Sequence, residues 1–165
     1  MAALKTGTLA PDFTLPTIEG KPFSLREALL QGPVVVAFFK VSCPVCQFAF
    51  PYLERIYQSY GKRNVTMVGI SQNESQDTAA FIHEYGVSFP VLLDDTRRYP
   101  VSNAFGLTNV PSIFWIAQEG EIEIASVGWS RNEIAEIGRK AAQSTGERAK
   151  PVFRPGEDVP DFRPG

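Results

Sequence analysis

The sequence holds only two cysteines, and both lie in the run Cys43-Pro44-Val45-Cys46. A thiolate attacks a disulfide sulfur to form a mixed disulfide, and a second thiol close by in the chain can reach back and release it. A bridge that closes so short a loop constrains the unfolded chain very little, so a purely structural disulfide explains the pair poorly. The spacing therefore predicts thiol-disulfide exchange, with Cys43 as the nucleophile and Cys46 as the resolving thiol.

The elements around the two cysteines are expected to activate Cys43. Residues 34–39 form an uninterrupted apolar run that is typical of a buried strand, and apolar residues recur at helical spacing from Cys46 onward. Cys43 then lies at the N-terminus of a helix, where unpaired N–H groups and the helix dipole stabilise a thiolate. Because Pro44 has no N–H, the donors that remain near this sulfur are those of Val45 and Cys46.

Other polar residues offer little competing chemistry. Lys40 is a candidate for an electrostatic role because it shortly precedes Cys43, although its long side chain can equally extend into water. Zinc is the main alternative use of such a pair, but it needs about four ligands and His83 is the sole histidine, so we expect no metal site. His83 itself is expected on the polar flank of a helix, and the charges between Asp94 and Arg98 in a solvated loop.

Length and composition exclude several classes of protein. The 165 residues, of which 44% are hydrophobic and 21% are charged, suit one ordinary globular domain. The formal net charge of -2 disfavours a nucleic-acid partner, and no apolar run approaches the roughly 18 residues of a membrane span. The N-terminus shows no basic stretch followed by an apolar segment, so we expect a cytoplasmic location, with the periplasm as the alternative.

Hydrophobic periodicity predicts an α/β order of elements. Residues 10–23, which contain several prolines and glycines, are expected to form a hairpin, with a short helix over 24–30 behind it. The further strands are expected at 34–41, 65–71, 89–93, 112–116 and 122–127. The further helices are expected from 46 to 60, at 75–85 and from 130 to about 141, with a loop or short helix at 99–105.

The composition changes near the C-terminal end of the chain. The last stretch is rich in proline and glycine, and Phe-Arg-Pro-Gly occurs in it twice, at 153–156 and 162–165. We therefore assign residues 1–145 to one domain and residues 146–165 to an extended C-terminal tail. Such a composition favours a disordered or loosely packed end over a docking arm.

The whole pattern resembles the thioredoxin-fold superfamily. Within it, the chain is most similar to the redoxin or AhpC-TSA branch, which holds the TlpA-like (ResA-like) thiol-disulfide oxidoreductases of bacteria and the peroxiredoxins. The stretches that carry the resemblance are 10–15 with 20–25, then 38–46, and then 110–112. The resemblance implies a thioredoxin-like α/β fold: a central mixed β-sheet flanked by helices, with an N-terminal β-hairpin extension and a βα insertion.

The same resemblance implies a substrate groove. In this family a cis proline faces the CxxC pair, and Pro111 occupies its position. The peptide of Val110 would then stand beside the active sulfur and pair with a substrate strand, in a groove shaped also by Pro44 and Val45. From the residues alone, a trans proline that begins a strand is favoured, because only about 5–6% of X-Pro bonds are cis.

Two departures from the family concern the proton of Cys46. Thioredoxin has a buried aspartate under the cysteines, at a position where this chain has Ala37. The related bacterial enzymes often have a glutamate shortly after the second cysteine, where this chain has Ala49. An acid from elsewhere, or a water, is therefore expected to assist Cys46.

Three functions follow from these observations, and the favoured one is a dithiol-disulfide oxidoreductase. It would act on disulfides of protein substrates, exchange electrons with an upstream thiol or disulfide partner, and use no cofactor beyond the Cys43-Cys46 couple. A peroxiredoxin-like thiol peroxidase is the first alternative. However, the Pro-x-x-x-Thr/Ser-x-x-Cys stretch of peroxiredoxins meets Val36 and Lys40 before Cys43, and Phe39 and Cys43 before Cys46. We therefore expect a low peroxidase rate. A non-catalytic binding module is the second alternative, which the two intact cysteines disfavour.

Overall fold

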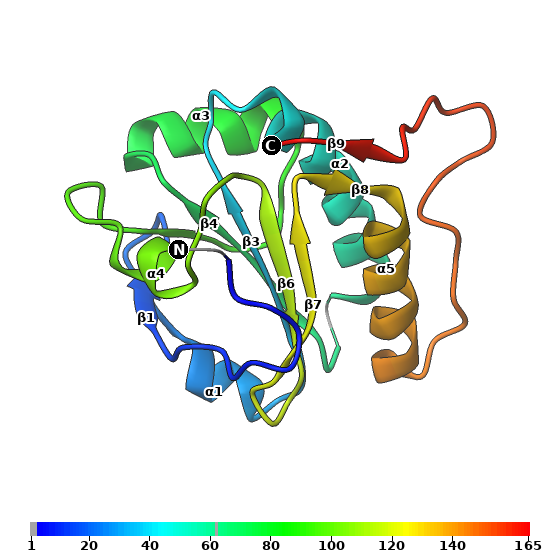
Figure 1. Cartoon of the computed structure of the whole chain (residues 1–165), viewed down its shortest axis with the longest axis horizontal. Helices are drawn as coiled ribbons and strands as arrows, with labels where there is room; N and C mark the ends of the chain where they lie inside the picture. Colours follow the sequence, from blue (N-terminus) through cyan, green and yellow to red (C-terminus); the bar gives the residue numbers. More distant parts are fainter. Residues whose placement is uncertain (1–2, 62) are drawn as a thin grey trace.

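A mixed five-stranded sheet forms the centre of the computed structural model, which describes residues 3–61 and 63–165 (Figure 1). Its strands are β3 (Val34–Phe39), β4 (Thr66–Ser71), β5 (Val91–Leu93), β6 (Ser112–Ile116) and β7 (Ile122–Val127), in the spatial order β5-β4-β3-β6-β7. The pairs β3–β4 and β4–β5 are parallel, whereas β3–β6 and β6–β7 are antiparallel. The expected α/β fold with a mixed sheet is confirmed.

The central strand β3 is apolar throughout because both faces of the sheet are covered. Side chains alternate between the two faces of a strand. Val35 and Ala37 pack into the core on the side of α2 (Pro44–Tyr60), whereas Val36 and Phe38 pack into a second core on the opposite side. Helix α2 therefore begins after a short loop, residues 40–43, that follows a strand fixed from both faces.

Helices cover both faces of the sheet, as Figure 1 shows. Besides α2 they are α1 (Leu25–Leu29), α3 (Ser75–Tyr85), α4 (Pro100–Ala104) and α5 (Arg131–Thr145). The two expected capping serines are confirmed: Ser24 accepts a hydrogen bond from the N–H of Glu27, and Ser130 accepts one from that of Glu133. Among the helices in the described part of the chain, none is long and apolar enough to cross a membrane.

The two additions to the basic sheet lie where they were expected. Strands β1 (Thr14–Pro16) and β2 (Pro22–Ser24) form an antiparallel N-terminal hairpin. This hairpin reaches the edge of the central sheet, where Thr17 forms a bridge with Leu92 of β5. The segment between β4 and β6 contributes α3, β5 and α4, which is the predicted βα insertion.

Asp94 corrects one sequence-based expectation, because it is not a solvated loop residue. Its side chain is only 2% exposed. Oδ2 accepts hydrogen bonds from the N–H and the hydroxyl of Ser102, at 2.8 and 2.7 Å, and Oδ1 accepts one from the N–H of Val101. These amides belong to the first turn of α4, where N–H groups have no partner inside the helix. Asp94 therefore holds the start of α4, while Asp95, Arg97 and Arg98 are exposed as expected.

The C-terminal tail also differs from the expectation of a loosely packed end. It is extended, but its β9 (Phe162–Arg163) pairs antiparallel with β8 (Trp129–Ser130), which follows β7. Val159 is buried, and Val152 and Phe153 pack against the core around α2 and α5. These apolar residues follow no helical or strand period, so hydrophobic periodicity does not predict that they dock. Figure 1 shows the tail leaving α5, passing outside that helix and returning to the sheet.

Candidate active site

Cys43 occupies the position just before α2 and caps that helix with its sulfur. The main-chain N–H of Cys46 donates a hydrogen bond to the Cys43 sulfur at 3.1 Å. Pro44 takes the first helical position, where a missing N–H costs nothing. An N–H donor and the N-terminal end of α2 thus meet at one partly exposed sulfur.

Cys46 lies behind Cys43 and is fully buried. Burial raises the pKa of the Cys46 thiol strongly, and its hydrogen bond with Cys43 raises the pKa further. Ala37 and Ala49 lie in the same buried cluster, at the two positions for which the family resemblance implied an acid. In the part of the chain that the structure describes, no carboxylate counts among the groups that shift this pKa. Cys46 is therefore held as a neutral thiol beside a more accessible partner.

Two side chains that the sequence analysis missed fix the loop before Cys43. Asn73, in the loop after β4, accepts a hydrogen bond from the N–H of Val41 at 2.9 Å through Oδ1. Gln47, in the first turns of α2, donates to the carbonyl oxygen of Val41 at 2.9 Å. Both backbone groups of Val41 are thus satisfied by side chains from different elements. The only sequence signal was their polarity next to apolar elements, which does not reveal such a pairing.

The loop before β6 supplies the wall opposite Cys43. The peptide bond between Val110 and Pro111 is cis, as the family resemblance implied. The Cys43 thiol donates a hydrogen bond to the carbonyl oxygen of Val110, with 3.5 Å between the sulfur and the oxygen. Ser112 holds the loop by donating to the carbonyl oxygen of Asn109 at 2.7 Å. The structure therefore brings the Val110 peptide to the reactive sulfur across 67 residues of sequence.

The other predicted site residues are placed as follows. Pro44 is exposed beside Cys43, whereas Val45 is only 8% exposed and lies mostly in the core. Lys40 is exposed, and its carbonyl oxygen accepts a hydrogen bond from the N–H of Cys43 at 3.2 Å. Its side chain helps to line a pocket of about 170 Å³ that also reaches Val110. Lys40 thus shares this pocket with the Val110 loop.

Three aromatic side chains pack together where α2 meets β8. The ring centroid of Trp129 lies 4.9 Å from that of Phe48 and 5.2 Å from that of Tyr52, and both of these residues are on α2. Trp129 is fully buried although it follows directly after the sheet. Residues 3–61 and 63–165 contain no cluster of His, Cys, Asp or Glu side chains that could hold a metal ion. His83 is exposed on α3.

The family comparison covers most of the chain. Residues 6–125 match the model of the AhpC/TSA family. The chain belongs to the AhpC/TSA family. The matched range contains the hairpin, the cysteine pair and the Val110-Pro111 loop, and ends within β7. It leaves α5 and the tail outside.

Curated relatives are similar over most of the chain. The "Thiol-disulfide oxidoreductase ResA" of Halalkalibacterium halodurans is 30% identical over 133 residues, which are 80% of this chain and 74% of that protein. The protein of the same name from Bacillus subtilis is 31% identical over 121 residues, which are 73% of this chain and 66% of that protein.

Solved structures show the same fold. A thioredoxin domain of a thiol-disulfide oxidoreductase from Bacteroides vulgatus superposes with a TM-score of 0.74 at 23% identity, over 84% of this chain and 98% of that one. The structure of MTB dsbF gives a TM-score of 0.68 at 27% identity, over 81% of this chain and 95% of that one. The thioredoxin-like fold is thereby confirmed. With its family, its relatives and its paired cysteines, the protein is a thiol-disulfide oxidoreductase.

Proposed function

We propose that this AhpC/TSA protein exchanges disulfides with protein substrates through Cys43 as nucleophile and Cys46 as resolving thiol. The observation that carries the proposal is the placement of the Cys43 sulfur. It receives the N–H of Cys46 at 3.1 Å and lies 3.5 Å from the carbonyl oxygen of Val110. The Cys43 sulfur thus accepts an N–H hydrogen bond at the start of α2 and contacts the Val110 loop on its other side.

The exchange proceeds in two balanced steps. The Cys43 thiolate attacks one sulfur of a substrate disulfide, so that a Cys43–substrate disulfide forms and the second substrate sulfur leaves as a thiolate and takes a proton. Cys46 then loses its proton and attacks Cys43, which forms the Cys43-Cys46 disulfide and releases the first substrate sulfur. Two electrons pass from the protein to the substrate, and an upstream dithiol partner returns them. The couple needs no further cofactor.

The substrate segment binds next to Val110 in this proposal. A peptide that pairs with the Val110 main chain would bring its own sulfur in front of Cys43, because the two groups are already in contact. The pocket of about 170 Å³ that Lys40 and Val110 help to line can take a neighbouring substrate side chain. Pro111 holds the Val110 peptide in this orientation at the start of β6.

Proton removal from Cys46 falls to water. Ala37 and Ala49 carry no acid, and both lie in the buried cluster that contains Cys46. Burial raises the pKa of Cys46, so little Cys46 thiolate is present at neutral pH. Deprotonation of Cys46 therefore slows its attack on the mixed disulfide. Resolution is thus the step at which this protein departs from a thioredoxin with a buried aspartate.

Cysteine variants test the assignment of roles. Cys43→Ser should abolish reduction of insulin disulfides, whereas Cys46→Ser should accumulate mixed disulfides that are visible by non-reducing electrophoresis and mass spectrometry. A serine is close in shape to cysteine, so both variants should fold. Mixed disulfides formed equally well by Cys43→Ser would exclude Cys43 as the nucleophile.

The reduction potential of the couple decides the direction of exchange. We propose net reduction of substrates, and equilibration against a dithiothreitol or glutathione series, read by alkylation and mass shift, measures the potential. A value near about -270 mV supports a thioredoxin-like reductant. A value near about -120 mV would instead make the protein an oxidant that donates its disulfide, and would overturn this direction.

A further inference from the structure

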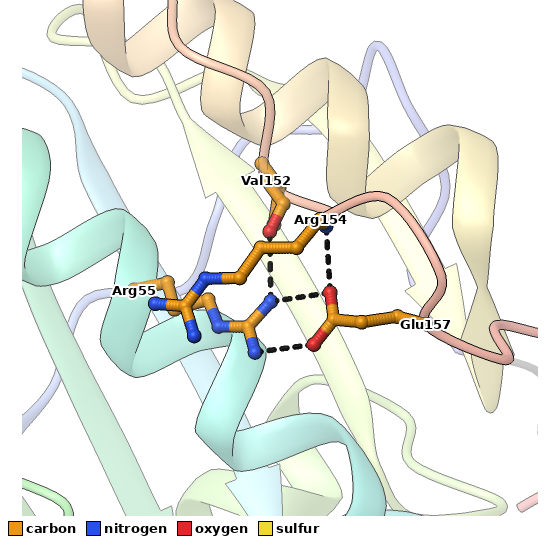
Figure 2. A network of polar contacts seen from close by, with 4 residues as sticks. All are labelled: Arg55, Val152, Arg154 and Glu157. Carbon is orange, nitrogen blue, oxygen red and sulfur yellow. Dashed lines mark hydrogen bonds and ion pairs between the residues drawn. The ribbon is translucent and has the colours of Figure 1, made fainter.

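The C-terminal tail is anchored to α2 by one charged cluster, shown in Figure 2. The guanidinium of Arg55 forms a two-pronged pair with the carboxylate of Glu157, at 2.8 and 2.5 Å. It also donates to the carbonyl oxygen of Val152 at 3.1 Å. The main-chain N–H of Arg154 donates to Glu157 at 2.6 Å. One α2 side chain thus holds a loop of the tail, and a bidentate arginine–carboxylate pair is a strong, directional contact.

A second anchor lies further along the tail, against the aromatic side chains where α2 meets β8. The indole N–H of the fully buried Trp129 donates to the carbonyl oxygen of Pro160 at 2.7 Å. Val159 is buried, and the N–H of Arg131 donates to the carbonyl oxygen of Asp161 at 3.0 Å. These contacts lead the chain into β9, which pairs with β8. The tail is therefore directed toward the active-site end of the sheet.

The end of the tail reaches the substrate side of the active site. A Cβ atom placed on Gly165 would lie only 2.2 Å from the carbonyl oxygen of Val110, so the main chain of residue 165 packs directly on that peptide. The side-chain amide of Asn109 donates to the carbonyl oxygen of Gly165 at 3.3 Å. The guanidinium of Arg163 lies 5.5 Å from the centre of the Phe48 ring on α2. Residues 163–165 thus contact the Val110 loop and the Phe48 ring of α2.

Gly128 allows this approach from the side of β7. A Cβ atom there would lie 2.6 Å from the carbonyl oxygen of Arg163 and 3.1 Å from the nitrogen of Gly165. Its φ of +77° is also a conformation that favours glycine. Gly128 lies in the chain between β7 and β8, and its N–H donates to the carbonyl oxygen of Pro111 at 2.8 Å. The tail end therefore rests on two loops that both border the site.

We propose that residues 161–165 select the disulfides that reach Cys43, by covering the Val110 peptide against extended protein strands while small disulfides pass. This inference rests on the proposed function, because it concerns the strand that pairs with Val110 there. Such a strand would run through the space that Gly165 fills. A protein substrate must therefore displace the tail end, whereas a small disulfide needs only the partly exposed sulfur of Cys43.

The displacement lowers the apparent affinity for protein disulfides. A ligand that binds only the uncovered state binds more weakly by the fraction of molecules in that state. The anchors at Arg55 and Trp129 lie upstream of residue 161, so the tail end can leave Val110 while the rest stays docked. Only the last residues need to move for a substrate to enter.

The test compares two disulfides in variants of the full protein. One variant ends after Pro160, which keeps both anchors, and the other is Gly165→Ala, whose new Cβ collides with Val110 and keeps the chain length. Lys150→Ala is the matched control, because it changes an exposed tail side chain and keeps the hydrogen bond that the main-chain N–H of Lys150 donates to the Tyr60 hydroxyl. Insulin and bis(2-hydroxyethyl) disulfide are the substrates, with dithiothreitol as the reductant.

The expected result is a change in the ratio of the two activities. In the truncated chain and in Gly165→Ala, kcat/KM for insulin should rise at least about fivefold while that for bis(2-hydroxyethyl) disulfide stays within about twofold. Lys150→Ala should keep the original ratio. An unchanged or lower ratio in both test variants would overturn the inference and leave the proposed function standing. If the unmodified protein reduced neither disulfide, both this inference and the proposed function would be overturned.

Discussion

The backbone N–H of Cys46 donates a hydrogen bond to the sulfur of Cys43 at 3.1 Å, while the Cys46 side chain is fully buried. The same residue therefore stabilises the accessible sulfur through its main chain and keeps its own thiol neutral through burial. Burial raises the pKa of the Cys46 thiol, and the hydrogen bond with Cys43 adds to this effect. The two cysteines are thereby made unequal, which is what a nucleophile and a resolving thiol require.

Alkylation should show this inequality directly. With reduced protein at pH 7, iodoacetamide should modify Cys43 first, because it is partly exposed and Cys46 is not. Cys43→Ser should react at least about tenfold more slowly than Cys46→Ser, since alkylation requires an accessible thiolate. Mass spectrometry of quenched samples measures both rates. Equal rates for the two variants would contradict the assignment.

The second step of exchange should depend steeply on pH. Because the pKa of Cys46 is raised above its ordinary value of 9.0, its thiolate fraction increases throughout the range from pH 7 to 9. The rate of resolution should therefore rise about tenfold per pH unit in that range. With 5,5′-dithiobis(2-nitrobenzoate), release of the first coloured thiolate reports attack by Cys43, and release of the second reports resolution.

The control for this experiment is Cys46→Ser, which should show the first phase and lack the second. A second phase in the unmodified protein that is independent of pH above 7 would indicate an internal base near Cys46. That result would contradict the proposal that water removes the proton of Cys46.

The tail anchor should weaken in acid. The hydrogen bonds from Arg55 and from the main chain of Arg154 lower the pKa of Glu157 from 4.5 to about 2. In this range the unfolded chain binds more protons than the folded one, so the stabilisation is complete above about pH 4.5 and is lost as the pH falls toward 2. Urea unfolding should find the unmodified protein more stable than Glu157→Gln at pH 6, with a smaller difference at pH 2.5.

A matched control for the anchor is Glu123→Gln, which removes a partly exposed pair with Lys140 at 3.2 Å. Exposed pairs contribute only about 0–1 kcal/mol, so this variant should follow the unmodified protein at both pH values. A difference between Glu157→Gln and the unmodified protein that stays the same from pH 6 to pH 2.5 would show that the Arg55 pair does not stabilise the fold.

Asp94 should matter for stability although it is remote from the cysteines. Asp94→Asn replaces one acceptor oxygen of a buried side chain that receives hydrogen bonds from Val101 and Ser102. The free energy of unfolding should fall by about 1–3 kcal/mol, because a buried polar group loses its partner. Urea denaturation measures the change. The exposed Glu119→Gln serves as the control, and an equal loss in both variants would contradict the role of Asp94.

Peroxide consumption should be slow despite the family to which the chain belongs. The hydroxyl that peroxiredoxins place before their cysteine is replaced by Lys40, whose side chain is exposed, and the proline by the buried Val36. Purified protein with a thioredoxin recycling system should therefore consume hydroperoxide far more slowly than it reduces insulin. Consumption at a rate comparable to that of a peroxiredoxin would show that Cys43 is oriented for peroxide by another group.

The cysteine pair, the α/β order and the helix caps could be predicted because each depends on residues that are close in sequence. The apolar run before Cys43 and the helical spacing after Cys46 place the pair at a strand-to-helix junction, whatever the rest of the chain does. The cis bond at Pro111 needed the family resemblance, since its neighbours in sequence alone favour a trans bond.

Tertiary contacts decided the remainder. Several contacts join segments that no periodic pattern connects. They are the hydrogen bonds of side chains to Val41, those of Asp94 to α4, and the contact of Val110 with Cys43. The tail is the clearest case, because its few apolar residues are scattered among prolines and glycines and show no helical or strand periodicity. Its docking combines Arg55 of α2, the buried Trp129 and the pairing of β9 with β8. Residues close in sequence therefore predict thiol chemistry at Cys43 and Cys46, whereas the folded structure shows which distant segments pack beside them.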